Sequence, residues 1–100
     1  MAETPPDFLA HKAGDSVGVA VRDLSPGRVK GGFLDGTAAP EFELLEPVPL
    51  GHKFAMTEIA DGADVIEYGV RVGRSTRAIR VGEHVHVHNV RSARWQNSVA

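Results

Sequence analysis

Three histidines near the end of the chain occupy alternate positions, with Val85 and Val87 separating His84, His86 and His88. In an extended strand alternate side chains point to the same side, so the three imidazoles would share one face. Neutral histidine binds metal ions, and near neutral pH it can transfer protons. The rise of a strand places neighbouring members about 7 Å apart at Cα and the outer pair about 13 Å apart. Two adjacent histidines could close on one ion, whereas all three could do so only if the strand bends.

The spacing leaves several interpretations of this triplet open. One is a solvated strand face that merely tolerates histidine. The others are a metal contact, a substrate contact and a polar subunit interface. A complete metal site would need ligands from elsewhere, because the chain has no second dense cluster of ligand residues.

A second candidate is Gly51-His52-Lys53, which follows the segment Pro47-Val48-Pro49-Leu50. The prolines stiffen the approach and the glycine allows close passage of the backbone, so His52 and Lys53 would project from a defined loop. Lysine offers a point positive charge and histidine a donor or acceptor, a pair that suits a carboxylate or hydroxyl ligand. The alternative is an exposed lysine beside a histidine that only anchors the loop.

These residues need strands to position them, and the sequence predicts an all-β protein. Alternating or β-branched runs predict strands at residues 16–22, 41–45, 65–70 and 83–90. In the first of these, Val17, Val19 and Val21 are expected to share one face. The only helical candidate is a single turn near residues 55–60.

One local pattern recurs, an aliphatic residue placed three positions before a glycine. It occurs at Leu24…Gly27, Ile59…Gly62 and Ile79…Gly82. We expect the aliphatic residue to pack on the core while glycine adopts a backbone angle that other residues resist. Three such turns in 100 residues favour a small, tightly folded barrel-like or clip-like β unit.

Composition restricts the function classes. The chain is 42% hydrophobic, carries a formal net charge of −2 and contains no cysteine, so disulfide scaffolds, thiolate metal sites and cysteine nucleophiles are excluded. The absence of cysteine fits a cytoplasmic protein. We expect no membrane-spanning segment, because no apolar run approaches the roughly 20 residues that a span needs.

Charge is distributed unevenly along the chain. Residues 1–67 carry five Lys/Arg and twelve Asp/Glu, whereas residues 68–100 carry six arginines and one glutamate. The basic final third indicates either an anionic partner or ligand, or mutual neutralisation of the two halves across the fold. Nucleic acid is not expected as a partner, because the basic residues are dispersed and not interleaved with aromatic ones.

Several of these segments together resemble a known pattern, the SAF domain of the altronate and galactarate dehydratase family. The same domain also occurs as the separate small subunit of sulfolactate sulfo-lyase. The similarity covers about residues 8–95, and its most specific elements are Gly51-His52-Lys53 and His84-Val85-His86-Val87-His88-Asn89. The resemblance implies a β-clip fold over residues 8–95, a loose N-terminal tail at 1–7 and a C-terminal tail at 96–100.

The resemblance also implies a function. Family members remove water from a sugar acid, and the sulfo-lyase branch removes sulfite from 3-sulfolactate. The chain would be a small accessory subunit, inactive by itself, beside a larger catalytic subunit that holds most of the ligands of a divalent metal such as iron. The motif match assigns His52 and Lys53 to catalysis and His84, His86 and His88 to substrate binding or to positions near the metal. A non-catalytic module that binds an anion or metal, and a structural interaction domain, remain alternatives.

Overall fold

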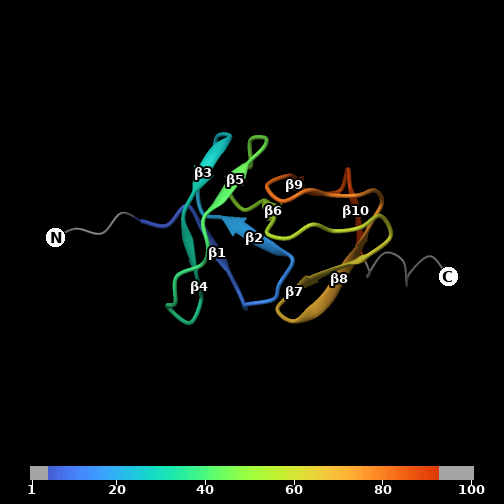
Figure 1. Cartoon of the computed structure of the whole chain (residues 1–100), viewed down its shortest axis with the longest axis horizontal. Helices are drawn as coiled ribbons and strands as arrows, with labels where there is room; N and C mark the ends of the chain where they lie inside the picture. Colours follow the sequence, from blue (N-terminus) through green and yellow to red (C-terminus); the bar gives the residue numbers. More distant parts are fainter. Residues whose placement is uncertain (1–4, 93–100) are drawn as a thin grey trace.

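The computed structural model describes residues 5–92, which form ten short strands and no helix. The strands are β1 (Phe8–Ala10), β2 (Val17–Ala20), β3 (Gly27–Val29), β4 (Gly31–Phe33), β5 (Phe42–Leu44), β6 (Lys53–Ala55), β7 (Asp64–Glu67), β8 (Val70–Ser75), β9 (His84–Val85) and β10 (Val90–Ser92) (Figure 1). The predicted all-β class is confirmed. None of the described residues belongs to a helix of the length and apolarity that crossing a bilayer requires.

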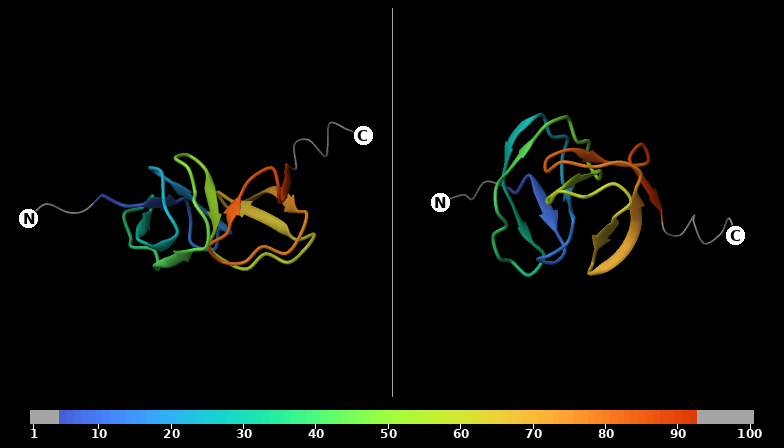
Figure 2. Two further views of the ribbon diagram at one scale, coloured as in Figure 1. Left: turned by 90° about the horizontal axis from the view of Figure 1, so that it is seen from above. Right: turned by 45° about the vertical axis from the view of Figure 1, so that its right-hand side comes forward.

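The strands form three small sheets. The largest has the order β4-β1-β2-β6-β9, in which β1 and β4 are parallel and the other pairs antiparallel. A second sheet, β10-β8-β7, is antiparallel, and β3 pairs with β5 in a two-stranded ribbon. In Figures 1 and 2, β2 and β6 lie between the ribbon and β1 on one side and the β7–β8–β10 sheet on the other.

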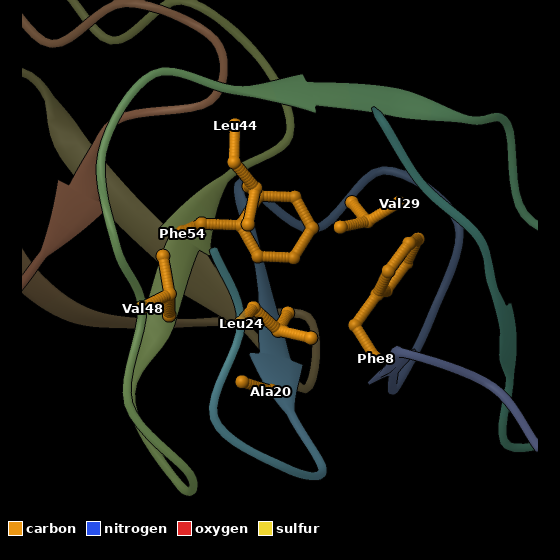
Figure 3. Close-up of a cluster of buried hydrophobic side chains, with 7 residues drawn as sticks. All are labelled: Phe8, Ala20, Leu24, Val29, Leu44, Val48 and Phe54. Atoms are coloured by element: carbon orange, nitrogen blue, oxygen red, sulfur yellow. The ribbon is translucent and has the colours of Figure 1, made fainter. Parts of the chain in front are cut away.

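Two clusters of buried side chains flank these central strands. The aromatic core comprises Phe8, Ala20, Leu24, Val29, Leu44, Val48 and Phe54 (Figure 3). The aliphatic core comprises Val17, Ala55, Ile59, Val65, Ile79 and Val85. Strands β2 and β6 contribute to both cores, which makes them the shared wall of the molecule.

This double role explains why the first predicted strand is only partly correct. Val17 is buried in the aliphatic core, but Ala20 packs in the aromatic core and Val21 is 38% exposed. The three valines therefore do not share one buried face. Gly18 between them is buried against the rings of Phe54 and Phe8, which leave little room for a side chain at this position.

The three predicted aliphatic–glycine turns are confirmed. Gly27, Gly62 and Gly82 all have positive φ angles, and the aliphatic residue before each is buried. The same pattern at Val48…Gly51 was missed; Val48 is buried and Gly51 has a φ of 81°. The anchors meet in pairs through isolated bridges, Leu24 with Val48 and Ile59 with Ile79.

Two other sequence predictions are wrong. The helical turn expected at residues 55–60 is absent, because Ala55 ends β6 and Ile59 instead exchanges two backbone hydrogen bonds with Ile79. The run at residues 65–70 is a hairpin rather than one strand. Tyr68 and Gly69 both have positive φ, 59° and 73°, as a two-residue type I′ turn requires.

The weaker strand prediction at residues 41–45 is confirmed by β5. The domain and tail boundaries at residues 8 and 95 stay predictions. The predicted tail at 96–100 and the end of the domain at 95 lie outside the described residues.

Candidate functional site: a histidine cluster beside a lysine–glutamate pair

Strand pairing brings the two histidine motifs together. β6 and β9 are antiparallel, with Lys53 opposite Val85 and Phe54 opposite His84. His52 immediately precedes β6, at the end of a turn in which its N–H donates to the Pro49 carbonyl at 2.9 Å. The loop and the late strand, 32 residues apart in sequence, therefore present their imidazoles at the same place.

The single long strand predicted at residues 83–90 is wrong. The chain bends after Val85, and this bend forms the site. β9 ends at Val85, and the chain turns through residues 86–89 before β10 begins. Asn89, fully buried, holds this turn: its Oδ1 accepts from the His86 N–H at 3.0 Å, and its Nδ2 donates to the His84 carbonyl at 2.9 Å. A continuous strand would place Val87 on the same side as the buried Val85, but Val87 is 82% exposed.

The bend gathers His52, His84, His86 and His88 into what we call the histidine cluster. His52 Nδ1 lies 2.8 Å from His84 Nε2, a hydrogen bond in which one nitrogen donates and the other accepts. The His52 and His86 rings stack with their centroids 4.3 Å apart, and the His88 ring is tilted 5.3 Å from that of His84. One ring nitrogen from each of His52, His84 and His86 lies within 4.8 Å of the other two.

The surroundings of His84 and His86 favour the neutral imidazole. Partial burial lowers the pKa of His84, and the neighbouring His52, His88 and His86 lower it further, against a smaller opposing effect of Glu46. Desolvation also lowers the pKa of His86, with added repulsion from His52, His88 and Lys53. Neutral imidazole is the form that binds metal ions or accepts a proton.

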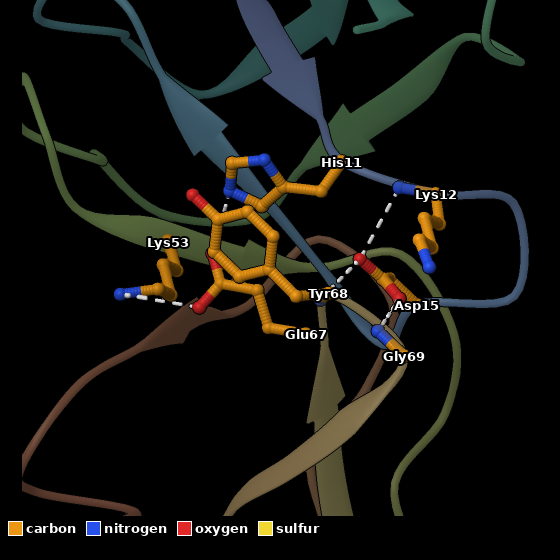
Figure 4. Close-up of polar contacts among 7 residues, drawn as sticks. All are labelled: His11, Lys12, Asp15, Lys53, Glu67, Tyr68 and Gly69. Carbon is orange, nitrogen blue, oxygen red and sulfur yellow. Dashed lines mark hydrogen bonds and ion pairs between the residues drawn. The ribbon is translucent and has the colours of Figure 1, made fainter. Parts of the chain in front are cut away.

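Lys53 engages a second group of ionisable residues. Its Nζ lies 3.8 Å from Oε1 of Glu67, a carboxylate whose side chain is only 9% exposed. The other carboxylate oxygen lies 3.1 Å from Nε2 of His11 (Figure 4). The His11 ring stacks on Tyr68 with a centroid separation of 3.5 Å, and its buried Nδ1 has no hydrogen-bond partner among the described residues.

Asp15 fixes the hairpin that carries Glu67. Its buried carboxylate accepts from the backbone N–H groups of Tyr68 at 2.9 Å, Gly69 at 3.1 Å and Lys12 at 3.3 Å (Figure 4). The turn at Tyr68-Gly69 is thereby tied to the segment that follows β1. His11 and Glu67 come from these two tied segments, which accounts for their contact.

A groove connects the two groups. It has a volume of about 480 Å³, within the range of small-molecule sites, and we call it the valine groove. It is lined by Lys53, Val65, Glu67, Val72, Thr76, Val85, His86, Val87, Val90, Arg91 and Ser92. His86 belongs to the histidine cluster and also lines the groove, so the cluster lies at the rim of the groove.

The five site residues named from the sequence are thus close together, but not in one group. His52, His84 and His86 converge, His88 lies beside His84, and Lys53 turns toward Glu67. Sequence analysis missed Glu67, His11 and Asn89. Glu67 had a usable signal: it alternates with Val65 in an apolar run, which places a carboxylate on the side of the strand that carries a core residue.

The arrangement can perform three chemical tasks. Neutral imidazoles can accept or donate a proton, or bind a metal ion through nitrogen. The Lys53 ammonium, held by Glu67 at the groove, can pair with an anionic group. The valine walls reduce the water around that pair, which strengthens its electrostatic interaction.

Comparisons with known proteins identify the family of the chain. The family model described as the altronate/galactarate dehydratase SAF domain matches residues 6–93. The chain is 43% identical over 91 residues to (2R)-sulfolactate sulfo-lyase subunit alpha of Chromohalobacter salexigens, covering 89% of this chain and 97% of that protein. It is 42% identical over 85 residues to altronate dehydratase of Escherichia coli, covering 85% of this chain but only 16% of that protein. Galactarate dehydratase of the same organism is 35% identical over 86 residues, with 15% of its length covered. The chain belongs to the altronate/galactarate dehydratase SAF-domain family.

Proposed function

We propose that the chain is the small component of a hydro-lyase that acts on a sugar acid, of the altronate or galactarate type. In this proposal it is inactive alone and contributes a histidine-lined wall to an active site that a larger catalytic component completes. The observation that carries the proposal is the convergence of His52, His84 and His86 at the open rim of the valine groove. The family membership supports the reaction class, and the short coverage of the dehydratases supports a larger partner.

The residues suit the chemistry of such a lyase. Dehydration breaks the C–H bond next to a carboxylate, with the proton passing to a base, and breaks a neighbouring C–O bond, with the departing hydroxide protonated by an acid. The enol that forms then becomes the keto acid. The imidazole of His84, whose neutral form is favoured, is suited to accept the proton as the base, and a protonated histidine of the cluster would give a proton to the departing hydroxide. Lys53 would pair with the substrate carboxylate, and Glu67 would hold the ammonium in place.

A divalent metal ion, for which the family resemblance implies iron held mainly by the larger component, would supply Lewis-acid stabilisation of the developing negative charge. The donors in this chain fit such an ion, because imidazole nitrogens suit iron, zinc, copper and nickel. His52, His84 and His86 are the residues that would reach it.

The second candidate is the small subunit of a sulfolactate sulfo-lyase, in which a C–S bond breaks and sulfite leaves. The match to subunit alpha from C. salexigens covers 97% of that protein, and this coverage supports the candidate. The same wall of residues serves both reactions, because sugar acids and sulfolactate are small hydroxylated anions. The cytoplasmic location expected from the sequence stays a prediction.

The proposal is tested by purifying the complex that forms on the chain in its native host and assaying it. Both dehydration of hexonates and hexarates and sulfite release from sulfolactate are measured. An active complex with a larger protein, together with an inactive isolated chain, is the expected result, and the assay identifies the branch. Turnover by the isolated chain at the rate of the complex would contradict the proposal.

A paired variant tests the site within that complex. His84→Gln/His86→Gln should lower kcat by at least about 100-fold, the usual effect of losing an acid–base group. Arg28→Gln serves as control, because Arg28 lies on β3 and forms an ion pair with the exposed Glu41, and neither residue belongs to the histidine cluster or the valine groove. If the histidine variant assembles less well but is fully active per complex, the cluster is an interface and not part of the active site.

A further inference from the structure

The geometry of the histidine cluster goes beyond a wall that another protein completes. Two of its nitrogens, His52 Nδ1 and His84 Nε2, are 2.8 Å apart, and the set that includes His86 lies within 4.8 Å. A tetrahedral zinc ion with Zn–N bonds of 2.0–2.1 Å holds its ligand nitrogens about 3.3 Å apart. Small side-chain rotations therefore suffice to bring all three nitrogens to one ion.

We propose that His52, His84 and His86 form a three-nitrogen binding site for one divalent transition-metal ion within this chain itself. The inference deepens the proposed function, because it gives the small component a bound metal ion of its own. A role of that ion in catalysis rests on the proposed function. The binding itself requires no partner. A larger component could then add ligands to an ion that is already bound.

The backbone of all three residues is anchored, which preorganises the site. The His52 N–H donates to the Pro49 carbonyl at 2.9 Å, and the His84 N–H donates to Oε2 of Glu46 at 3.0 Å. The His86 N–H donates to Asn89, whose amide also holds the His84 carbonyl. These contacts fix the backbone. The rings themselves contact one another, through the His52–His84 hydrogen bond and the stacking of His52 on His86, and an ion bound between them would replace that hydrogen bond.

The donor set indicates the class of ion. Within the described residues the group contains imidazoles and no carboxylate, which favours iron, zinc, cobalt, nickel or copper over magnesium and calcium. Three protein ligands with a fourth position left over is the arrangement of catalytic rather than structural zinc sites. His86 is exposed and Val87 beside it is 82% exposed, so the fourth position would face outward.

His88 provides an internal test of this assignment. Its ring is tilted by 42° to that of His84, and it is not part of the three-nitrogen group. His11 lies with Glu67 and Tyr68, outside the cluster. The structure therefore separates three ligand histidines from two that share their chemistry but not their position.

The experiment is metal titration of the purified full chain, with any affinity tag removed and metal stripped by a chelator. Calorimetry with Zn²⁺ gives stoichiometry and affinity, and the visible absorption of Co²⁺ reports a low-coordinate nitrogen site. We expect one ion per chain and no binding of Mg²⁺. His86→Ala should weaken Zn²⁺ binding by at least about 100-fold, because loss of second-shell contacts alone weakens metal sites by 10- to 100-fold.

His88→Ala and His11→Ala should each stay within about threefold of the unmodified chain. His86 is exposed, so its removal should preserve the fold, which a ¹⁵N–¹H spectrum of each variant checks. Absence of binding in the folded chain, or equal losses in the His86→Ala and His11→Ala variants, would overturn the inference. Because no activity is measured, a negative result here leaves the proposed lyase function to its own assay.

Discussion

The two cores differ in what surrounds them. The aromatic core is built around the rings of Phe8 and Phe54, whose centroids are 5.0 Å apart and which meet edge to face. The ion pair of Arg28 and Glu41, on β3 and just before β5, is exposed, at 68% and 41%. The aliphatic core has no aromatic member, and Val85 leads directly into the histidine turn.

The difference extends to the ionisable groups. Beside the aliphatic core, the side chain of Glu67 is 9% exposed and contacts two basic residues, and the histidine cluster adjoins the same groove. Buried ionisable groups in a concave site are characteristic of function, whereas exposed ion pairs contribute little. One half of the molecule therefore provides the scaffold and the other carries the candidate site, and β6 links them.

The largest expected effect is on the scaffold. Phe54→Ala should lower the free energy of unfolding by about 3–5 kcal/mol, because it removes a fully buried ring that contacts Phe8 and Phe42. Val85→Ala in the aliphatic core should lower it by about 2 kcal/mol, since it removes the equivalent of two buried methylene groups and leaves a smaller cavity. Urea denaturation of both variants checks the ranking.

Leu50→Ala is the matched control, because Leu50 is 61% exposed and its removal should change stability by less than about 0.5 kcal/mol. Equal losses for Phe54→Ala and Val85→Ala would remove the distinction between the two cores.

The sequence was sufficient for much of the scaffold. Buried Leu24, Ile59 and Ile79 and the glycines that follow them were identified because a φ angle near +80° to +130° strongly selects glycine. The presence of two cores could not be predicted. It depends on Val17 and Ala20 packing in different directions from one strand, which pairings distant in sequence decide.

For the site, residue types were predictable and geometry was not. Alternation identified the three late histidines, and the Gly-His-Lys motif identified His52. The same alternation predicted a straight strand, whereas Asn89 bends the chain through hydrogen bonds to His84 and His86. The alternation of residue types does not reveal that the buried side-chain amide of Asn89 takes hydrogen bonds that a neighbouring strand would otherwise make. The contact of His11 with Glu67, 56 positions later in the sequence, likewise depends on the fold.

The intermediate effect is expected at the turn itself. Asn89→Ala should lower the free energy of unfolding by about 2–3 kcal/mol, because it leaves the His86 N–H and the His84 carbonyl without their partner. It should also loosen the histidine cluster, which ring ¹⁵N chemical shifts of His84 and His86 would record. Val87→Ala, in the same turn but 82% exposed, should do neither. Unchanged ring shifts in Asn89→Ala would show that the turn does not position the histidines.

The smallest effect is a pH dependence confined to the chemical half. Folding lowers the pKa of His84 and His86 from the ordinary value of about 6.5, through desolvation and the neighbouring His52 and His88. Unfolded histidine therefore takes up protons first as the pH falls, so stability from this source is complete above about pH 6.5 and is lost as the pH drops through the folded-state pKa values.

Urea unfolding of the metal-free chain should show a midpoint urea concentration that falls from pH 7 to 6 to 5. His84→Gln should reduce this dependence of the midpoint on pH, because glutamine does not titrate. Glu46 opposes the effect at His84 and Lys53 reinforces it at His86, so the slope reports the balance of the whole cluster. Phe54→Ala should shift every midpoint downward and leave the slope between pH 7 and 5 unchanged. A slope that survives in His84→Gln but disappears in Phe54→Ala would place the titration in the scaffold and reverse the assignment of the two halves.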